Sequence, residues 1–342
     1  MVLARKDLQL VHALQVWPRA SWSRLGPILD VDPVTLARRW SSIGDRGLAW
    51  TTCQPRQSSF RHGAIVEVEC VPGSVNKVVA DLSRDRSCIS IDVVSGGRSL
   101  ILTVGCTTAA NLNRYLISQL GEMSGVRSVR TNPVVTTIAG AVQWRVNALL
   151  EEQVAAIEDA QRAADRQMED RASMSESDHR AVIEILCHDG RATSTLIGKR
   201  LGIPQRRARE YLHSTLMSGL IELRTDVRRQ ESGWPVSAWY FLRVPAARLQ
   251  EVGARLRTLR TVRTILSVAG PANVLVLVWL PSINEVEGLE IAMEQTLPSV
   301  RIVDRSLVLA VRKRVGRTFG DDESPLDVVP WELAQSDQTI DS

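Results

Sequence analysis

The chain contains the same pattern twice, and this duplication restricts its fold more than any other feature of the sequence. The segment beginning at Asp7 recurs at Asp178, 171 positions later, and Ser95-Gly96 recurs as Ala269-Gly270 at an offset of 174. Between these points the offset drifts by only three positions. Such a constant spacing marks an internal repeat, so we expect both halves to fold into the same architecture.

Each copy begins with a helical part. Leu10, Val11 and Leu14 recur at helical spacing, and Ser21 suits the N-cap of a second helix. Asp32-Pro33 is a strong start signal for a third helix, because an aspartate cap is followed by proline at the first helical position. Copy two repeats this pattern over about 178–188, 194–201 and 205–217. We therefore predict two helix-turn-helix, winged-helix-like domains, at residues 1–55 and 175–228.

Each copy continues with an α+β part. In copy one, strand-like segments at 64–71, 89–94, 100–104 and 126–137 alternate with helical segments at 74–82 and 108–120. Copy two repeats the order between Trp239 and Val311. The order β-α-β-β-α-β is the ferredoxin-like arrangement. The predicted fold class is therefore α+β, with two βαββαβ effector-sensing and dimerisation domains at 62–140 and 236–315, in tandem with the two helical domains.

The remaining segments are interpreted from composition. Residues 141–174 are rich in Ala, Glu, Gln and Arg and predict a helical linker, whereas 316–342 predict an acidic, disordered tail. The sequence holds no run of roughly 18 apolar residues, the length of a membrane span. Its five cysteines form no C-x-x-C pair, which favours buried thiols in a reducing compartment over a disulfide framework or a metal site. We expect a cytoplasmic protein without contact with a membrane.

Positive charge is concentrated in the helical parts. Residues 1–62 carry nine Lys and Arg against four Asp and Glu, a net +5, and residues 178–230 carry ten against six, a net +4. Because the whole chain carries +4, the rest must sum to −5. Two short basic segments in an otherwise acidic chain are typical of a protein that binds a polyanion such as double-stranded DNA.

The segment from Val31 to Trp40 reads VDPVTLARRW, which resembles the recognition helix of the Lrp/AsnC (feast/famine) family of regulators. A helix-turn-helix followed by a βαββαβ module also resembles that family, over nearly the whole of residues 4–315. The resemblance implies a sequence-specific DNA-binding transcription regulator that associates with itself through its βαββαβ domains. An α-helix fits the major groove, where arginine can donate two hydrogen bonds to guanine. The expected DNA-binding residues are Thr35, Arg38, Arg39, Arg206, Arg207 and Arg209.

The glycine turns of the α+β parts resemble the G-x-x-D hairpin of the family's effector domain. Glycine turns leave backbone N–H groups uncovered, and such groups can hold a carboxylate. The resemblance therefore implies control by an amino acid or another small carboxylate. This chain departs from the pattern because Ser99 and Asn273 stand where the family has aspartate. The expected effector-binding residues are Gly96, Gly97, Ser99, Gly270 and Asn273.

The two recognition helices differ from each other. Glu210 occupies the position of Arg38, and Tyr211 occupies that of Arg39. A glutamate repels phosphate and accepts hydrogen bonds only from base amino groups. We therefore expect one chain to bind an asymmetric DNA site, with each helix contacting a different half.

Two other functions compete with this interpretation. Siroheme decarboxylases share the same architecture, but their chemistry needs general acids or cationic clamps, and neither βαββαβ core, 64–137 or 239–311, contains a histidine. A scaffold with vestigial helical domains is the other alternative, which salt-dependent DNA affinity would exclude. The sequence indicates no catalytic constellation, no metal site and no cofactor, and we expect the protein not to be an enzyme.

Overall fold

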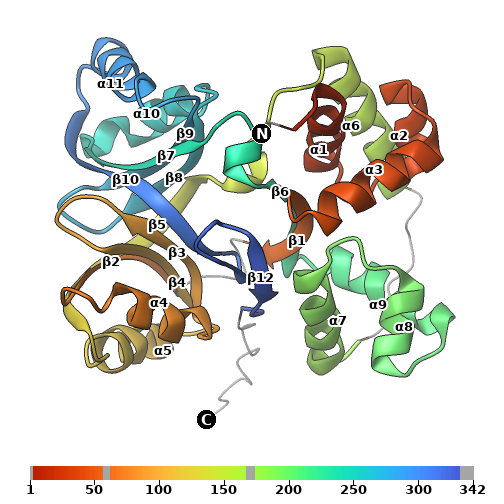
Figure 1. Ribbon diagram of the computed structural model, residues 1–342, viewed down its shortest axis with the longest axis horizontal. Coiled ribbons are helices and arrows are strands. Elements are labelled where there is room, and N and C mark those ends of the chain that lie inside the picture. Colours follow the sequence, from red (N-terminus) through yellow and green to blue (C-terminus); the bar gives the residue numbers. More distant parts are fainter. Residues whose placement is uncertain (1–2, 57–61, 167–173, 332–342) are drawn as a thin grey trace. The chain divides into compact units, whose positions relative to one another are not determined.

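Equivalent parts of the two copies fold together. The computed structural model describes residues 3–56, 62–166 and 174–331, which form two compact units (Figure 1). One unit combines both helical parts, within 3–56, 145–166 and 174–232, and the other combines both α+β parts, within 62–144 and 233–331. The predicted domains were consecutive along the chain, whereas the structure pairs each domain with its own duplicate.

The first unit contains two sets of three helices. The bounds agree closely with the sequence patterns, and α3, α7 and α8 each begin at a residue whose side chain caps the helix. Asp32, for example, accepts hydrogen bonds from the backbone N–H groups of Val34 and Thr35 at 2.9 and 3.2 Å. The helices are α1 (Arg5–Val16), α2 (Trp22–Leu29), α3 (Pro33–Asp45), α7 (Glu176–His188), α8 (Ser194–Leu201) and α9 (Gln205–Met217).

The turn before each third helix has the same geometry in both copies. Asp30 caps the C-terminus of α2 and Gly202 caps that of α8, and both residues adopt a left-handed backbone conformation with φ of 50° and 67°. Glycine adopts this conformation without steric cost, and aspartate is among the few other residues that tolerate it. The shared turn sets α3 and α9 across the helices that precede them, as a helix-turn-helix requires.

A two-stranded ribbon joins the two helical domains. Strand β1 (Ala49–Pro55) follows α3, and β6 (Ile221–Val227) follows α9. The two strands pair antiparallel from Ala49↔Val227 to Pro55↔Ile221. The winged-helix prediction is therefore wrong in one respect: the strand after each third helix pairs with its duplicate, so it does not fold back as a wing on its own domain.

The second unit is a closed barrel of eight strands. The bounds are β2 (His62–Cys70), β3 (Cys88–Val94), β4 (Leu100–Cys106), β5 (Val126–Ala139), β7 (Val236–Arg243), β8 (Val262–Val268), β9 (Val274–Leu280) and β10 (Arg301–Arg314). Copy one forms a sheet in the order β3-β4-β2-β5, copy two forms β8-β9-β7-β10, and the pairings β5–β8 and β10–β3 close the ring. Each sheet has the predicted ferredoxin-like strand order, but the two share one barrel.

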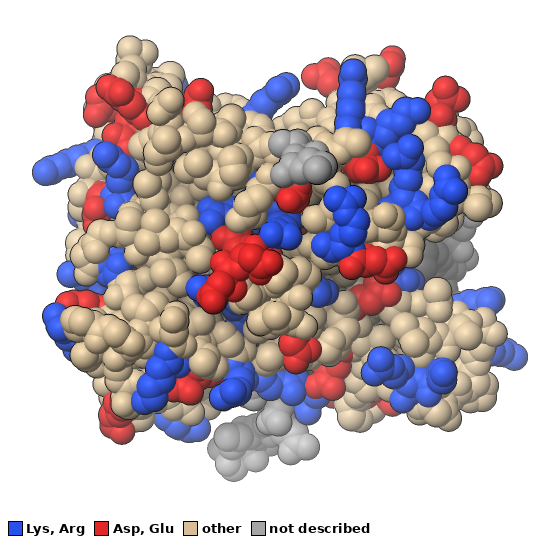
Figure 2. All heavy atoms as spheres, viewed as in Figure 1, with Lys and Arg blue, Asp and Glu red and all other residues tan. Residues whose placement is uncertain are grey.

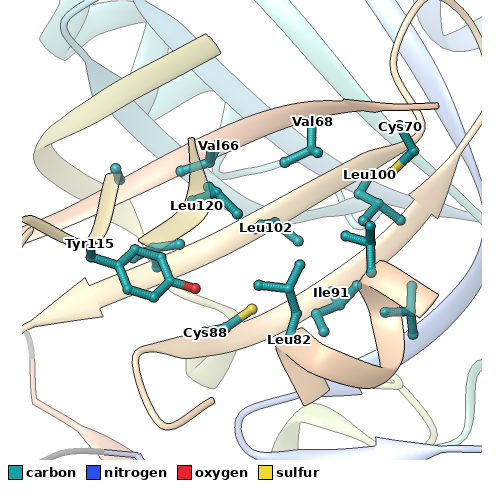
Figure 3. Packing of buried hydrophobic residues seen from close by; sticks show 14 of the residues in the cluster. Val66, Val68, Cys70, Leu82, Cys88, Ile91, Leu100, Leu102, Tyr115 and Leu120 are labelled. Atoms are coloured by element: carbon teal, nitrogen blue, oxygen red, sulfur yellow. The ribbon is translucent and has the colours of Figure 1, made fainter. Parts of the chain in front are cut away.

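Helices cover the outer faces of this barrel. In Figure 1, α4 (Val75–Ser83) and α5 (Ala109–Arg114) lie on one side, and α10 (Leu249–Leu256) and α11 (Glu285–Thr296) lie on the other. Helix α5 continues as the π-helical turn η2 (Tyr115–Leu120). Figure 3 shows how alternate residues of β2 and β4, such as Val66 and Leu102, pack beneath Leu82 of α4 and Leu120. Burial of each such side chain contributes about 1.5–3 kcal/mol.

Aromatic and cationic side chains stack on the inner face of the copy-two sheet. The guanidinium carbon of Arg263 lies 3.9 Å from the ring centroid of Trp279, and the ring of Trp144 lies 4.9 Å from the same indole. Cation–π contacts of this kind contribute about 2 kcal/mol when they are desolvated. Gly105 stands at the equivalent position of β4, so copy one has no counterpart of the Trp279 side chain.

The linker and the C-terminal segment depart from the sequence prediction. Only α6 (Glu151–Asp165) and the short turn η3 (Ala141–Gln143) are helical within 141–166, and 167–173 lie outside the described residues. Helix α6 packs against the first domain, where the Gln153 side chain donates to the carbonyl of Ile28 at 3.1 Å. Residues 145–166 therefore belong to the first unit, whereas η3 belongs to the second.

The acidic segment after residue 316 is ordered as far as the structure describes it, so the prediction of disorder is wrong for 317–331. Strand β11 (Arg317–Phe319) pairs with β10, and β12 (Pro325–Val328) pairs with β11. Two features outweigh the acidic composition. Phe319 and Trp331 are buried, and the carboxylate of Glu323 accepts a hydrogen bond from the backbone N–H of Val311 at 3.0 Å. Residues 332–342 lie outside the described part.

Within the described residues, none of the helices combines the length and the apolar character that crossing a lipid bilayer requires.

His12 makes the first unit sensitive to acid. Its Nδ1 accepts hydrogen bonds from the backbone N–H groups of Ala148 and Leu149 at 3.1 and 3.0 Å. Burial, and secondly the charge of Arg145, lowers its pKa from 6.5 to about 4. The unfolded chain therefore binds a proton more readily than the folded chain. We expect the contribution of His12 to the free energy of unfolding to be complete above pH 6.5. The free energy of unfolding should fall by up to about 3 kcal/mol as the pH approaches 4.

Urea unfolding at a series of pH values measures this loss. His12→Asn is the matched control, because an amide oxygen replaces the accepting nitrogen without titrating. The variant should lose less stability between pH 7 and pH 4.5 than the natural chain. An identical pH dependence in both proteins would contradict the assignment to His12.

Two helical glycines of the second unit should respond oppositely to alanine. A Cβ atom at Gly253 of α10 would lie 2.7 Å from Cγ2 of Ile138 on β5, whereas the same atom at Gly288 of α11 would have no described neighbour within 4 Å. Alanine favours a helix over glycine by about 1 kcal/mol. We expect Gly288→Ala to raise the free energy of unfolding by about that amount and Gly253→Ala to lower it. Urea titration followed by tryptophan fluorescence tests both, and stabilisation by Gly253→Ala would show that α10 and β5 are not in close contact.

Candidate functional site

Helix α3 presents an exposed outer face that carries the predicted Arg38. Leu36 and Ile43 are buried against the rest of the domain, whereas Val34 and Arg38 are exposed on the opposite side. Thr35 lies at the first turn, where its backbone N–H is capped by Asp32, and its side chain is half-buried. The outer face of α3 therefore begins at a fixed N-terminus and carries Arg38 one turn further on.

Arg38 and Arg39 have different surroundings. Arg38 is exposed to solvent. Arg39 is half-buried and forms an ion pair with Asp7 of α1, with Nη1 2.8 Å from Oδ1. Arg39 thus connects the third helix to the first, and of the two predicted residues Arg38 is the one whose guanidinium is available to an external partner.

The second copy connects the same two helices with different residues. The hydroxyl of Tyr211 on α9 donates to Asp178 of α7 at 3.2 Å, and the Arg207 guanidinium donates to the same hydroxyl at 2.7 Å. Asp178 and Tyr211 occupy the positions of Asp7 and Arg39 in copy one. Alignment of the two copies could have indicated this contact. Both copies have aspartate at the first position, and the second position holds Arg39 in copy one and Tyr211 in copy two, both of which can donate a hydrogen bond to it.

All three predicted arginines of α9 are exposed, and Arg207 is the one that bonds to Tyr211. Arg209 is exposed, and Arg206 is exposed while its Nε lies 3.1 Å from a carboxylate oxygen of Glu210. An exposed pair of this kind is worth less than about 1 kcal/mol, so Arg206 can exchange Glu210 for another anion at little cost. Figure 2 shows Lys and Arg side chains gathered where Figure 1 labels α2, α3 and α6, with a smaller group over α8 and α9.

The predicted effector residues lie in two equivalent hairpins of the barrel. Gly96 has φ of 100°, which favours glycine. Ser99 Oγ accepts from the backbone N–H of Cys70 at 3.0 Å, and Asn273 Oδ1 accepts from the N–H of Val244 at 2.8 Å. Ser99 and Asn273 therefore perform the same task in both copies: each ties its hairpin to the end of a neighbouring strand.

Each hairpin also contacts the last strand of the other copy. The backbone N–H of Ser95 donates to the carbonyl of Leu307 on β10, and that of Ala269 donates to the carbonyl of Pro133 on β5, both at 2.9 Å. At Gly270 a Cβ atom would lie 2.5 Å from Oδ1 of Asn132. The glycine turns are thus part of the seam between the two sheets, and at least these two N–H groups are already occupied.

A charged cluster lies beside the first hairpin, and we call Glu67, Arg98 and Asp304 the seam cluster. The Nε atom of Arg98 lies 2.9 Å from a carboxylate oxygen of Glu67, and its Nη2 pairs with Asp304. The guanidinium carbon lies 4.3 Å from the ring centroid of Phe241. Asn132 donates to the other oxygen of Glu67 at 3.0 Å. Arg98 of copy one is therefore held by residues from both copies.

The seam cluster retains unused hydrogen-bonding capacity. Arg98 is 9% exposed, and its Nη1 atom has no hydrogen-bond partner within the described part of the chain. The same holds for Oγ of Ser306, which lies 3.7 Å from the position of a Cβ atom at Gly96. Buried donors of this kind are costly when they are unpaired, so they favour an added acceptor such as water or a carboxylate. Sequence reasoning missed the cluster because Arg98 and Asp304 lie 206 positions apart.

Comparison with known proteins places these parts in context. Residues 63–141 match the family described as the Lrp/AsnC ligand binding domain. An uncharacterised HTH-type transcriptional regulator of Pyrococcus furiosus is 21% identical over 140 residues, which are 40% of this chain and 94% of that protein. A second one, from Pyrococcus abyssi, is 21% identical over 135 residues, or 39% of this chain and 85% of that protein.

A solved structure resembles the chain over nearly its full length. It is the crystal structure of the siroheme decarboxylase NirDL, with a TM-score of 0.56 and 11% identity, covering 93% of this chain and 95% of that one. At this identity the likeness concerns the fold alone. The regulators each correspond to one half of the present chain in length, whereas NirDL corresponds to both halves. Residues 63–141 therefore match an Lrp/AsnC ligand binding domain, and the fold of nearly the whole chain is similar to that of NirDL.

Proposed function

We propose that the protein is a sequence-specific DNA-binding transcription regulator controlled by a small carboxylate. The observation that carries this proposal is the exposure of Arg38 on α3 and of Arg206 and Arg209 on α9, in two helix-turn-helix domains of one compact unit. The net positive charge of both helical segments supports it, because basic surfaces attract the phosphate backbone over long range. The likeness to HTH-type regulators from two Pyrococcus species points in the same direction.

The two helices should contact DNA differently. On α3 the exposed Arg38 can donate two hydrogen bonds to the O6 and N7 atoms of guanine. On α9 the equivalent position is Glu210, and the cationic groups lie one turn earlier at Arg206 and one position earlier at Arg209. Glu210 accepts hydrogen bonds, so it favours the amino group of cytosine or adenine. The preferred operator is consequently asymmetric.

Alanine at Arg38 or at Arg209 should weaken specific DNA binding by about 1–3 kcal/mol each, because each change removes one cationic contact with a base or a phosphate. Fluorescence anisotropy measures this on a duplex that the natural protein selects from random-sequence DNA. Arg39→Ala is the neighbouring control. Loss of its ion pair with Asp7 should lower the melting temperature, and it should change the dependence of DNA affinity on salt concentration less than Arg38→Ala or Arg209→Ala does. Unchanged affinity of Arg38→Ala and Arg209→Ala, with helix content intact, would contradict the proposal.

The effector part of the proposal rests on the seam cluster. The Arg98 Nη1 atom is a charged donor with spare capacity, and Ser306 adds a hydroxyl near the same hairpin. A carboxylate bound to arginine forms a charge-assisted hydrogen bond, which is stronger than a neutral one. The predicted residues Gly96, Gly97 and Ser99 belong to this hairpin, whereas Gly270 and Asn273 belong to the equivalent hairpin of copy two.

A second function, siroheme decarboxylation, is favoured by one observation. NirDL matches this chain over both halves, with a TM-score of 0.56 and coverage of 93% of the chain. Arg98, Arg263 and Lys313 are cationic side chains with little exposure in the barrel unit, and cations could hold the carboxylates of a tetrapyrrole. Lys313, however, already donates to the carbonyl of Asp85 at 2.7 Å.

One ligand series separates the two functions. Amino acids, other small carboxylic acids and siroheme are added in turn to the full chain, and the melting temperature and the visible spectrum are recorded. We expect a small carboxylate to raise the melting temperature in step with its saturation. Arg98→Gln should abolish that rise, whereas Arg127→Gln, which removes an exposed arginine paired with Glu69, should retain it. Saturable binding of siroheme with conversion to a decarboxylated product would instead establish the second function.

A further inference from the structure

Two arginines at equivalent positions hold the helical domains together. Arg19 lies between α1 and α2, and Arg191 lies between α7 and α8, 172 positions later. Arg19 donates from Nη1 and Nη2 to the carbonyls of Gly190 and Ala192 at 2.5 and 2.9 Å. Each of these carbonyls belongs to a neighbour of Arg191.

The contact is reciprocal. Arg191 donates from Nη1 and Nη2 to the carbonyls of Pro18 and Ala20 at 2.6 and 2.9 Å. Each guanidinium thus binds the backbone on both sides of the other arginine, and we call this arrangement the arginine clamp. The planar guanidinium offers two parallel N–H donors in a fixed geometry, which a lysine ammonium cannot reproduce. The four hydrogen bonds of the clamp define both the distance and the rotation between the α1–α2 loop and the α7–α8 loop.

Both charges are retained although the clamp is largely buried. Burial, and secondly the neighbouring charge of Arg19, lowers the pKa of Arg191 to about 10, while Asp189 raises it. Arg19 is lowered in pKa by burial and raised by Asp189 in the same way. A guanidinium keeps its charge in proteins, so both groups are protonated at neutral pH. Arg191 also stacks on Trp22, the first residue of α2, with 4.2 Å between the guanidinium carbon and the ring centroid.

The joint beneath the clamp leaves little room for movement. The backbone N–H of Gly190 donates to the carbonyl of Thr51 on β1 at 2.8 Å. A Cβ atom at Gly190 would lie 2.8 Å from Cγ2 of Thr51 and 3.0 Å from its backbone carbon. The hydroxyls of Thr51 and Thr225 lie 3.0 Å apart across the β1–β6 ribbon. Close packing and paired backbone groups make this joint resist both sliding and rotation.

The clamp lies close in sequence to both recognition helices. Ala20, whose carbonyl Arg191 binds, immediately precedes the N-cap of α2, and α2 leads through one turn to α3. Ala192 stands in the same relation to α8 and α9. We infer that Arg19 and Arg191 are positioning residues that fix the separation of α3 and α9, so that one chain reads two half-sites at a single spacing on one DNA duplex. This inference rests on the proposed DNA-binding function.

Spacing is a sharp test because DNA turns once in about 10–10.5 base pairs, so five inserted pairs move one half-site to the opposite face of the duplex. A rigid pair of helices tolerates this poorly, whereas a flexible pair adapts. The experiment uses the full chain and duplexes in which the selected half-sites are separated by increasing numbers of base pairs, together with duplexes that carry one half-site only.

The natural protein should bind best at one spacing and about tenfold or more weaker when five pairs are inserted. In the double variant Arg19→Lys, Arg191→Lys, affinity at the best spacing should fall at least tenfold, the spacing profile should flatten, and affinity for a single half-site should change less than twofold. Arg24→Lys is the matched control, because Arg24 is an exposed arginine on α2 outside the clamp, and it should keep the natural profile.

Each outcome can be distinguished from a failure of the proposed function. A natural protein that binds with equal affinity at all spacings would overturn the inference and leave DNA binding intact. A double variant with an unchanged sharp profile would also overturn it. If the natural protein binds none of the selected duplexes, the proposed function fails and the inference fails with it. Circular dichroism verifies folding, and if the double variant does not fold, each single lysine variant should flatten the profile in the same direction.

Discussion

The barrel unit depends on one constraint: its two longest strands each belong to two sheets. Residues 126–133 of β5 pair within copy one, and the remainder pairs with β8 of copy two. Strand β10 does the converse, pairing first with β7 and then with β3. A four-stranded sheet alone would leave unpaired backbone groups at its edges, which promote uncontrolled association. Exchange of the two long strands closes the ring, so the second copy provides for the first what a partner subunit would otherwise supply.

Closure also explains why the polar residues lie where they do. The hairpins at Ser95 and Ala269 donate to the strand of the opposite copy, and the Arg98 side chain spans the same seam to Asp304. A site at the seam can combine side chains from both copies. Glu67 of copy one is matched by Phe241 of copy two, and the cation of Arg98 contacts both. The guanidinium is thus stabilised by an anionic partner from one copy and an aromatic partner from the other. Two identical halves could not provide both, because they would carry the same residue at this position.

The sequence predicted what local signals determine. The Asp32-Pro33 start, the hairpin glycines and the constant offset fixed the helices, the strands and the ferredoxin-like order, because capping and turn chemistry act over a few residues. It did not predict barrel closure, the β1–β6 ribbon or the ordering of residues 317–331, since pairing between distant segments leaves no local periodicity. The candidate site divides in the same way. Arg38 lies where the helix pattern indicated, whereas the ion pair of Arg39 with Asp7 joins residues 32 positions apart.

For the proposed DNA-binding function, duplication within one chain changes how the two recognition helices can evolve. In a homodimer, one substitution alters both recognition helices and association depends on protein concentration. In this chain Arg38 and Glu210 occupy equivalent positions in one polypeptide, so each helix can specialise while its partner remains at high effective concentration. That advantage requires a joint that keeps the two helices in register as their outer faces diverge. Arg19 and Arg191 meet this requirement because the four hydrogen bonds of the clamp go to backbone carbonyls, and backbone carbonyls persist whatever side chains the recognition helices acquire.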